Sequence, residues 1–224
     1  MLLLRKVLIS LCIIFAVTST AVAASFEEGK EYQRLPAAIT NNMLVKDLTK
    51  EANDKVQVLE FFSYGCNWCY KLDPIVSKWS KTLPQDVAFQ RVPVEFQPSW
   101  RNLTKAYYVA VDLKALDKVH DSFFEAVQSE RITNTDKATL RQFFAARGIK
   151  PEDFDQGFDS FDVNRKQKWA NAISRAYRIT AVPTLLVQGP KGSFTSTVSM
   201  AGGEDNLIKV TNYLIQMQRE TKKS

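Results

Sequence analysis

The chain has 224 residues, of which 45% are hydrophobic and 24% are charged, and its formal net charge at pH 7 is +6. The hydrophobic fraction is typical of a soluble globular protein with a buried core. Lysine and arginine are scattered among the acidic residues, which excludes a basic patch for nucleic acid, and the sequence contains neither an internal repeat nor a low-complexity segment.

The first 23 residues have the pattern of a signal peptide. Arg5 and Lys6 provide positive charge, an apolar run extends from Val7 to Val17, and Ala21-Val22-Ala23 has the small-residue spacing that a signal peptidase recognises. The apolar run is short for a membrane span. We therefore expect cleavage after Ala23 or Ala24 and export to the periplasm; cleavage after Ala23 leaves 224 − 23 = 201 residues.

A buried central strand is predicted after a polar, mixed stretch that extends to Lys55. Within that stretch, residues 31–35 resemble an edge strand, which Pro36 ends. From Val56 to Phe62 the residues are almost continuously apolar, as in a strand that is covered on both faces. Glu60 interrupts this run.

Two cysteines follow the strand in a C-x-x-C motif, and a helical pattern begins at the first of them, Cys66. At a helix N-terminus, unpaired N–H groups and the helix dipole favour an anion, so the Cys66 thiol should ionise easily and act as the nucleophile. Cys69 lies one turn further along, where it can resolve a mixed disulfide. The pair is therefore predicted to hold a disulfide, transfer it to another protein and recover it.

A zinc site and a structural disulfide are the other uses of a C-x-x-C motif. A four-ligand zinc site within one chain is not expected, because Cys12 lies in the signal peptide and His120 is the single histidine. Metal binding by the reduced cysteine pair in a dimer is left as an alternative. His120 is expected to be a surface or partly buried helix residue without a catalytic role.

The remaining elements alternate between strands and helices. The helix that begins at Cys66 contains Pro74, which should kink it, and residues 87–94 read as another strand. The pattern is helical from residue 99 to about 162, with one helix expected over residues 135–147 that Gly148 should end. Helix resumes at about residue 164. A buried strand then follows Pro183, a hairpin strand covers residues 194–200, and an amphipathic helix ends the pattern.

This order resembles the DsbA family of periplasmic thiol:disulfide oxidoreductases. The matching stretches are residues 58–63 before Cys66, Tyr70 after Cys69, Val182-Pro183-Thr184, and the long helical insertion. The resemblance implies an α/β, thioredoxin-like fold with an inserted all-helical domain. The expected divisions are a signal peptide over residues 1–23, a thioredoxin-like domain over 24–98 and 164–224, and the helical insertion over 99–163.

The resemblance implies a cis peptide bond between Val182 and Pro183, packed against the active-site cysteines. The backbone N–H and C=O of Val182 can then pair with an extended substrate segment. We expect Asn67 and Trp68, between the cysteines, to contact substrate as well. The best-known members of the family have Pro-His at these two positions, so the strength and direction of the redox bias are left open.

Glu60 is expected to be partly protonated or paired, because burial of an ionised carboxylate is costly. Arg91, on the next predicted strand, is a candidate partner. The resemblance implies that an acidic residue at this position manages the proton of the buried thiol. Glu60 and Pro183 therefore join Cys66 and Cys69 as predicted catalytic residues.

The predicted function is a dithiol oxidase that introduces disulfide bonds into exported proteins, with the Cys66–Cys69 disulfide and no bound cofactor. The resemblance implies reduced or unfolded exported proteins as substrates and a DsbB-like inner-membrane quinone reductase as the reoxidant. A monomer is expected. The alternatives are the same chemistry run as a reductase or isomerase, and a chaperone-like polypeptide-binding protein that does not use the thiols.

Overall fold

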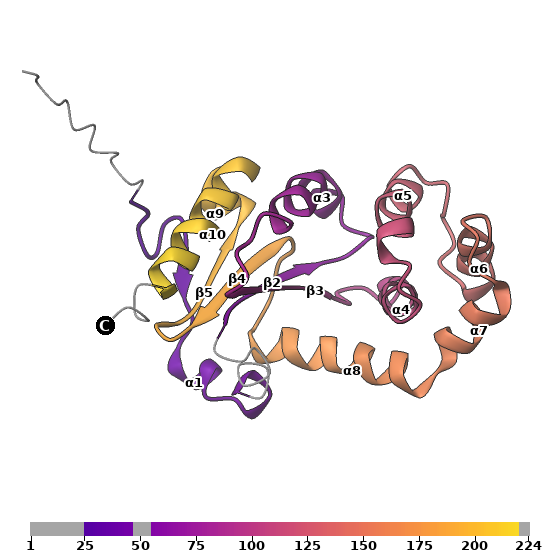
Figure 1. Cartoon of the computed structure of the whole chain (residues 1–224), viewed down its shortest axis with the longest axis horizontal. Helices are drawn as coiled ribbons and strands as arrows, with labels where there is room; N and C mark the ends of the chain where they lie inside the picture. The colour runs from indigo at the N-terminus through magenta and orange to yellow at the C-terminus, as the bar shows by residue number, and fades with distance from the viewer. Residues whose placement is uncertain (1–24, 47–54, 220–224) are drawn as a thin grey trace, which may run out of the picture.

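A computed structural model describes residues 25–46 and 55–219, so the predicted signal peptide and Cys12 lie outside the described residues. The described residues form a five-stranded sheet of order β1-β5-β4-β2-β3 (Figure 1). The strands are β1 (Gln33–Arg34), β2 (Val56–Phe62), β3 (Val87–Pro93), β4 (Thr184–Gly189) and β5 (Gly192–Thr197). Strand β2 pairs in parallel with β3 and antiparallel with β4, so it lies in the interior of the sheet, next to the edge strand β3.

Both faces of the sheet are covered by helices, which explains the continuous apolar run of β2. Helices α3 (Asn67–Ser80) and α10 (Glu204–Arg219) cover one face, and α1 (Ala37–Thr40) and α8 (Phe161–Ala176) lie on the other (Figure 1). All seven residues of β2 are buried. Because side chains alternate along a strand, Glu60 shares a face with Val58, and Val58 packs in a core cluster with Leu72 of α3 and Leu207 of α10.

A block of helices lies beyond the β3 edge of the sheet (Figure 1). It contains α4 (Trp100–Asp112), α5 (Leu116–Gln128), α6 (Lys137–Ala145) and α7 (Pro151–Asp159). Gly148 follows α6 with a φ of 74°, a left-handed conformation that suits glycine and confirms it as the predicted stop. Helix α8 begins within the block and runs back beneath the sheet, so it joins the two parts of the molecule.

Two sequence expectations need adjustment. The predicted edge strand over residues 31–35 is reduced to β1, which pairs antiparallel with β5. The predicted strand over residues 194–200 is wrong at its end, because β5 stops at Thr197 and helix α9 (Val198–Ala201) follows. The Thr197 hydroxyl accepts a hydrogen bond from the Met200 N–H at 3.2 Å and so caps this helix. Among the described residues, no helix combines the length and apolar character that crossing a membrane requires.

Candidate active site

The first cysteine of the motif caps the helix that follows β2. Cys66 is the N-cap of α3, and its Sγ atom accepts a hydrogen bond from the Cys69 N–H at 3.2 Å. Both cysteines are thiols in this structure. The Cys66 side chain retains 9% exposure, whereas Cys69 is fully buried. A partner can therefore reach Cys66 more readily than Cys69, as the motif predicts.

The two thiols have pKa values shifted in opposite directions. A hydrogen bond from the Cys69 thiol, helped by the N–H groups of Cys69 and Trp68, lowers the pKa of Cys66 to about 7 despite its partial burial. Burial is the main cause that raises the pKa of Cys69, and the neighbouring charges of Cys66 and Glu60 act in the same direction. Near neutral pH the pair thus consists of one sulfur that ionises readily and one that keeps its proton.

The segment before β4 lies against the nucleophile. The Val182–Pro183 peptide bond is cis, as the resemblance implies, and the Cys66 Sγ atom lies 3.5 Å from the Val182 carbonyl oxygen. Trp68, Val182 and Pro183 line one apolar groove, together with Ala181 and residues 197–199. Trp68 is 58% exposed, and Asn67 is also exposed, at the first position of α3. The structure therefore brings Val182, Pro183 and Trp68 together beside Cys66.

Glu60 lies on the buried face of the sheet that α3 covers, and it is 1% exposed. Its Oε2 atom accepts a hydrogen bond from Arg91 Nε at 2.8 Å, and the two residues are direct neighbours across β2 and β3. This contact confirms Arg91 as the predicted partner. Burial raises the pKa of Glu60, and the positive charge of Arg91 opposes that shift only in part. Glu60 is therefore a carboxyl group that can exchange a proton near the fully buried Cys69.

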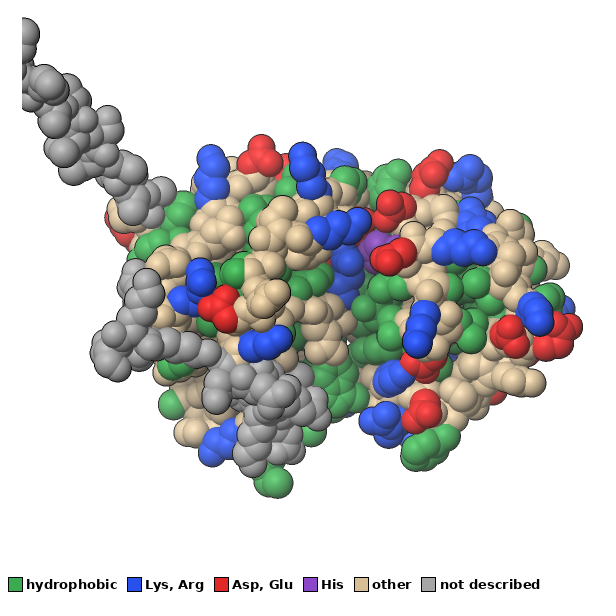
Figure 2. All heavy atoms as spheres, in the orientation of Figure 1, with side chains coloured by type: hydrophobic (Ala, Val, Ile, Leu, Met, Phe, Trp, Pro, Cys, Tyr) green, Lys and Arg blue, Asp and Glu red, His purple; other side chains and the backbone are tan. Residues whose placement is uncertain are grey.

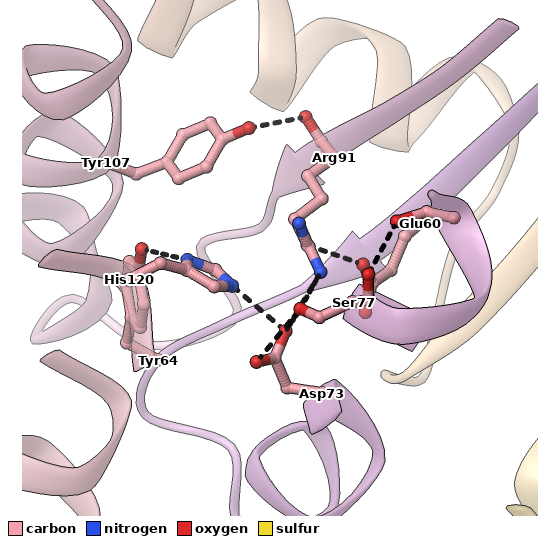
Figure 3. A network of polar contacts seen from close by, with 8 residues as sticks. Glu60, Tyr64, Asp73, Ser77, Arg91, Tyr107 and His120 are labelled. Carbon is pink, nitrogen blue, oxygen red and sulfur yellow. Dashed lines mark hydrogen bonds and ion pairs between the residues drawn. The ribbon is translucent and has the colours of Figure 1, made fainter. Parts of the chain in front are cut away.

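The Arg91 guanidinium also binds two side chains of α3, as Figure 3 shows. Its Nη2 atom lies 3.0 Å from Asp73 Oδ1 and 2.8 Å from Ser77 Oγ. Asp73 is 4% exposed, and burial would raise its pKa, but hydrogen bonding from His120 and the charge of Arg91 lower it below the ordinary value. One guanidinium is thus shared between two buried carboxyl groups, one of which stays ionised.

His120 is buried, which corrects the expectation of a surface or partly buried residue. It is 4% exposed, and its Nε2 atom lies 2.9 Å from Asp73 Oδ1. Its Nδ1 atom lies 2.6 Å from the hydroxyl of Tyr64, two residues before Cys66 (Figure 3). Ionised Asp73 can only accept, so Nε2 donates the proton of that bond, and the Tyr64 hydroxyl can either donate to Nδ1 or accept from it.

Tyr64, Asp73 and His120 were missed because each looks ordinary in its own segment. The sequence did contain a signal for two of them, because a polar residue stands at a position that the helical pattern assigns to the core. Asp73 lies between the buried residues Leu72 and Val76, and His120 follows the buried Val119. Within the part of the chain that the structure describes, no group of three or more His, Cys, Asp or Glu side chains is arranged to hold a metal ion.

Comparison with known proteins identifies relatives along almost the whole chain. Residues 57–214 match the model of the DSBA-like thioredoxin domain family. The thiol:disulfide interchange protein DsbA of Pseudomonas syringae pv. tomato is 31% identical over 99% of both chains. The protein of the same name from Bordetella pertussis is 34% identical over 74% of this chain and 78% of its own.

Solved structures give the same result. The crystal structure of Pseudomonas aeruginosa DsbA superposes with a TM-score of 0.77 at 28% identity, covering 89% of this chain and 97% of that one. The DsbA oxidoreductase of Xylella fastidiosa superposes with a TM-score of 0.73 at 25% identity, covering 87% and 98% of the two chains. The thioredoxin-like fold predicted from the sequence is thereby confirmed.

Proposed function

Since the chain belongs to the DSBA-like thioredoxin domain family and is a thiol:disulfide oxidoreductase, we propose that it oxidises cysteine pairs of exported proteins through Cys66 and Cys69. The observation that carries this proposal is the contrast between the two thiols. Cys66 retains some exposure at a helix N-terminus with a pKa of about 7, and Cys69 is buried with a raised pKa.

The reaction is two successive thiol–disulfide exchanges. A substrate thiolate attacks Cys66 Sγ of the enzyme disulfide, an S–S bond forms between the two proteins, and Cys69 leaves and takes up a proton. The second substrate thiol loses its proton and attacks the substrate sulfur of the mixed disulfide, and Cys66 leaves as a thiolate. Two electrons pass from the substrate to the enzyme. Cys66 is a good leaving group because its pKa of about 7 lies below the ordinary thiol value of about 8.5.

Glu60 supplies and removes the proton of Cys69 in this proposal. Its charge contributes to the raised pKa of Cys69, and its own pKa is raised by burial. The protonated carboxyl group can donate when Cys69 leaves as a thiolate, and the carboxylate can accept when Cys69 attacks during reoxidation.

The substrate segment binds along Val182 and Pro183 in this proposal. The Val182 carbonyl oxygen lies 3.5 Å from the attacked sulfur, and an extended polypeptide can hydrogen-bond to the backbone there as an added strand. The adjoining apolar groove, which includes Trp68, can hold side chains next to the substrate cysteine. Reduced or unfolded exported proteins are the substrates proposed for this groove.

The cellular setting completes the proposal. Residues 1–23 direct export to the periplasm, an oxidising compartment in which disulfides persist. A DsbB-like inner-membrane quinone reductase accepts the two electrons from the Cys66–Cys69 dithiol and restores the disulfide. No bound cofactor takes part, and the enzyme works as a monomer.

Trapping of substrates tests the proposal. In a Cys69→Ala variant the Cys66 thiolate can attack a disulfide of an exported protein, whose other sulfur leaves as a thiol, and no Cys69 is present to displace that protein again. The mixed disulfide on Cys66 should therefore accumulate, and mass spectrometry can identify the attached proteins. The Cys66→Ala, Cys69→Ala double variant is the matched control and should trap nothing. Equal capture by both variants would favour a chaperone-like binder that does not need its thiols.

A further inference from the structure

The buried histidine of α5 takes no part in the exchange reaction proposed above. The ring of His120 packs edge-on against the rings of Phe62 and Phe124, with centroid distances of 5.9 and 5.2 Å. Its two nitrogens face Tyr64 and Asp73 (Figure 3). Because the aromatic side chains fix the ring, its Nε2 atom is held in hydrogen-bond contact with the Asp73 carboxylate.

His120 and Arg91 bind the same oxygen atom. Asp73 Oδ1 lies 2.9 Å from His120 Nε2 and 3.0 Å from Arg91 Nη2. The Ser77 hydroxyl makes a longer contact with this oxygen, at 3.3 Å. A buried carboxylate that loses one donor depends more heavily on the donors that remain. The hydrogen bond from His120 therefore limits how strongly Asp73 binds Arg91.

Arg91 is also the partner of Glu60. Its Nε atom lies 2.8 Å from Glu60 Oε2 while its Nη2 atom binds Asp73. Both carboxyl groups are almost fully buried, so neither can replace this partner with bulk water. The guanidinium thus lies between two carboxyl groups that compete for it, and His120 contacts the one on α3.

We propose that His120 is a positioning residue for the proton step at Cys69. Its hydrogen bond to the Asp73 carboxylate lets the Arg91 guanidinium stay in contact with Glu60. This inference rests on the proposed function, in which Glu60 exchanges the proton of Cys69, and it names a further residue that controls that step. Without His120, the guanidinium moves toward Asp73, and Glu60 then keeps its proton to higher pH because less positive charge lies beside it.

Several elements contribute charged and titratable groups around Glu60. They are Cys69 and Asp73 of α3, Arg91 of β3, Tyr107 of α4 and His120 of α5. Around His120 itself, Tyr64 lies on the cysteine loop, and Lys81, Asp117 and Asp121 line the adjoining cleft. Burial is the main cause that raises the pKa of Glu60, and the charge of Arg91 is the main opposing one. A weaker contact with Arg91 therefore raises this pKa further.

Glutathione disulfide isolates the step in which Cys69 attacks. The Cys66 thiolate of the reduced enzyme attacks one sulfur of glutathione disulfide, and one glutathione leaves as a thiolate. Cys69 then gives its proton to Glu60, its sulfur attacks Cys66 Sγ, and the second glutathione leaves as a thiolate. Acid quench and mass spectrometry give the rate constant for decay of the mixed disulfide between pH 4 and 9. This rate constant should rise with pH through the titration of Glu60.

Three variants locate the effect of the histidine. His120→Leu removes both polar contacts and should raise the midpoint of the pH profile by about one pH unit, since a nearby opposite charge changes a carboxyl pKa by roughly 1–3 units and only part of it is lost. His120→Gln keeps an amide that can donate to Asp73 and should restore most of the wild-type midpoint. Tyr64→Phe removes the other contact of His120 and should leave the midpoint unchanged, because the bond to Asp73 remains.

Two further variants test the charges themselves. In a Glu60→Gln background, His120→Leu should no longer shift the midpoint, because the titrating carboxyl group is absent. Asp73→Asn removes the competing charge and keeps the imidazole, so the midpoint should fall as Arg91 stays with Glu60. This variant keeps the inference testable if His120→Leu does not fold. Circular dichroism establishes that each variant is folded.

The outcomes separate this inference from the proposed function. An unchanged or lower midpoint in folded His120→Leu, a shift that persists in the Glu60→Gln background, or no shift in Asp73→Asn overturns the positioning role, while decay of the mixed disulfide still supports the exchange chemistry. A loss of stability without a change of midpoint would make the role of His120 purely structural and overturns it as well. Failure of the reduced enzyme to form the mixed disulfide on Cys66 overturns the proposed function and this inference with it.

Discussion

The two thiols of the motif are only three residues apart, yet their environments differ in exposure and in hydrogen bonding. Cys66 accepts the Cys69 N–H at the start of α3, whereas Cys69 lies fully buried above Glu60. Donors around Cys66 stabilise its thiolate, and burial disfavours a charge on Cys69. This contrast lets one sulfur attack and leave while the other holds a proton.

The lowered pKa of Cys66 predicts how the stability of the reduced protein depends on pH. Folded Cys66 loses its proton at about pH 7, and an unfolded thiol loses it at about 8.5. Between these values the unfolded chain binds more protons, so the free energy of unfolding rises with pH. The gain is lost as pH falls through 7. Above about 8.5 the raised pKa of Cys69 acts the other way, because the folded thiol keeps its proton.

Thermal unfolding of the reduced and oxidised forms between pH 6 and 9 measures this effect. The stability of the reduced form relative to the oxidised form should increase from pH 7 to about 8.5, since neither sulfur titrates in the disulfide. A reduced Cys66→Ser variant should lack the increase. A difference that does not change with pH would contradict the stabilised thiolate.

Glu60→Gln should slow the steps in which Cys69 gains or loses a proton. Glutamine keeps an oxygen that can accept from Arg91, so the fold should survive, and removal of a costly buried carboxyl group should leave stability equal or higher. Loss of a general acid and base typically costs about 10²-fold or more in rate. Stopped-flow exchange with dithiothreitol across pH gives the rate of each step.

Glu95→Gln is the matched control for this substitution. Glu95 also has a carboxylate with only 8% side-chain exposure, and it is hydrogen-bonded by Gln167 and Asn171. The Glu95→Gln substitution should leave the pH profile of thiol–disulfide exchange unchanged. An unaltered profile in Glu60→Gln would argue against a proton role for Glu60.

At the scale of the element, helix α3 carries most of the chemistry. Its first turn provides the N–H groups that lower the pKa of Cys66, and its buried face carries Cys69 and Asp73. Pro74 lies inside the helix, and the helix nevertheless continues to Ser80. The cysteines and the polar cluster below them are therefore positioned by one rigid segment.

Asn67 and Trp68 at the start of α3 should make this protein a weaker oxidant than its Pro-His relatives. Proline fits the first helical position, and histidine can add a charge or an N–H donor near the Cys66 sulfur. An Asn67→Pro, Trp68→His double variant should therefore have a lower Cys66 pKa and a more oxidising potential. About 30 mV corresponds to about 1.4 kcal/mol for this couple, so one hydrogen bond is measurable by equilibration with glutathione. An equal or lower potential would show that other loops set the bias.

At the scale of the whole molecule, the helical block is fastened to the active-site helix by His120. This residue of α5 hydrogen-bonds Asp73 of α3 and Tyr64 of the cysteine loop. The contact lies at the floor of a cleft between α3 and α5, whose lining includes Ser77, His120 and Asp121. In Figure 2 a histidine side chain is visible in the hollow between the two lobes, with charged side chains around it.

His120→Ala should destabilise the protein by about 1–3 kcal/mol or more, because it leaves two buried polar groups without this partner. A double-mutant cycle with Asp73→Asn should give a coupling energy of about 0.5–3 kcal/mol in urea denaturation. Asp121→Ala, at the neighbouring exposed position of α5, should change stability by no more than about 0.5 kcal/mol. Additive effects of the His120 and Asp73 substitutions would mean that the hydrogen bond does not fasten the block.

The sequence by itself determined the local features of this protein. Three features depend only on residues that are neighbours in the sequence, so they could be predicted from it. They are the apolar run from Val56 to Phe62, the C-x-x-C spacing after it and the helical periodicity of the insertion. Glu60 was recognisable for the same reason, as the one acid in a buried strand. Arg91, on the next predicted strand, was only a candidate partner, and the register of β2 and β3 makes it the direct neighbour of Glu60.

Only the tertiary structure decided which distant side chains meet. His120 lies 56 residues from Tyr64 and 47 from Asp73, and their contacts depend on how α5 packs against α3. The position of Trp100 on Gly65 likewise depends on where the chain crosses back after β3. The periodicity of apolar residues predicts which face of a helix or strand is buried. It does not predict which residues cover that face, because these depend on how whole helices and strands pack together.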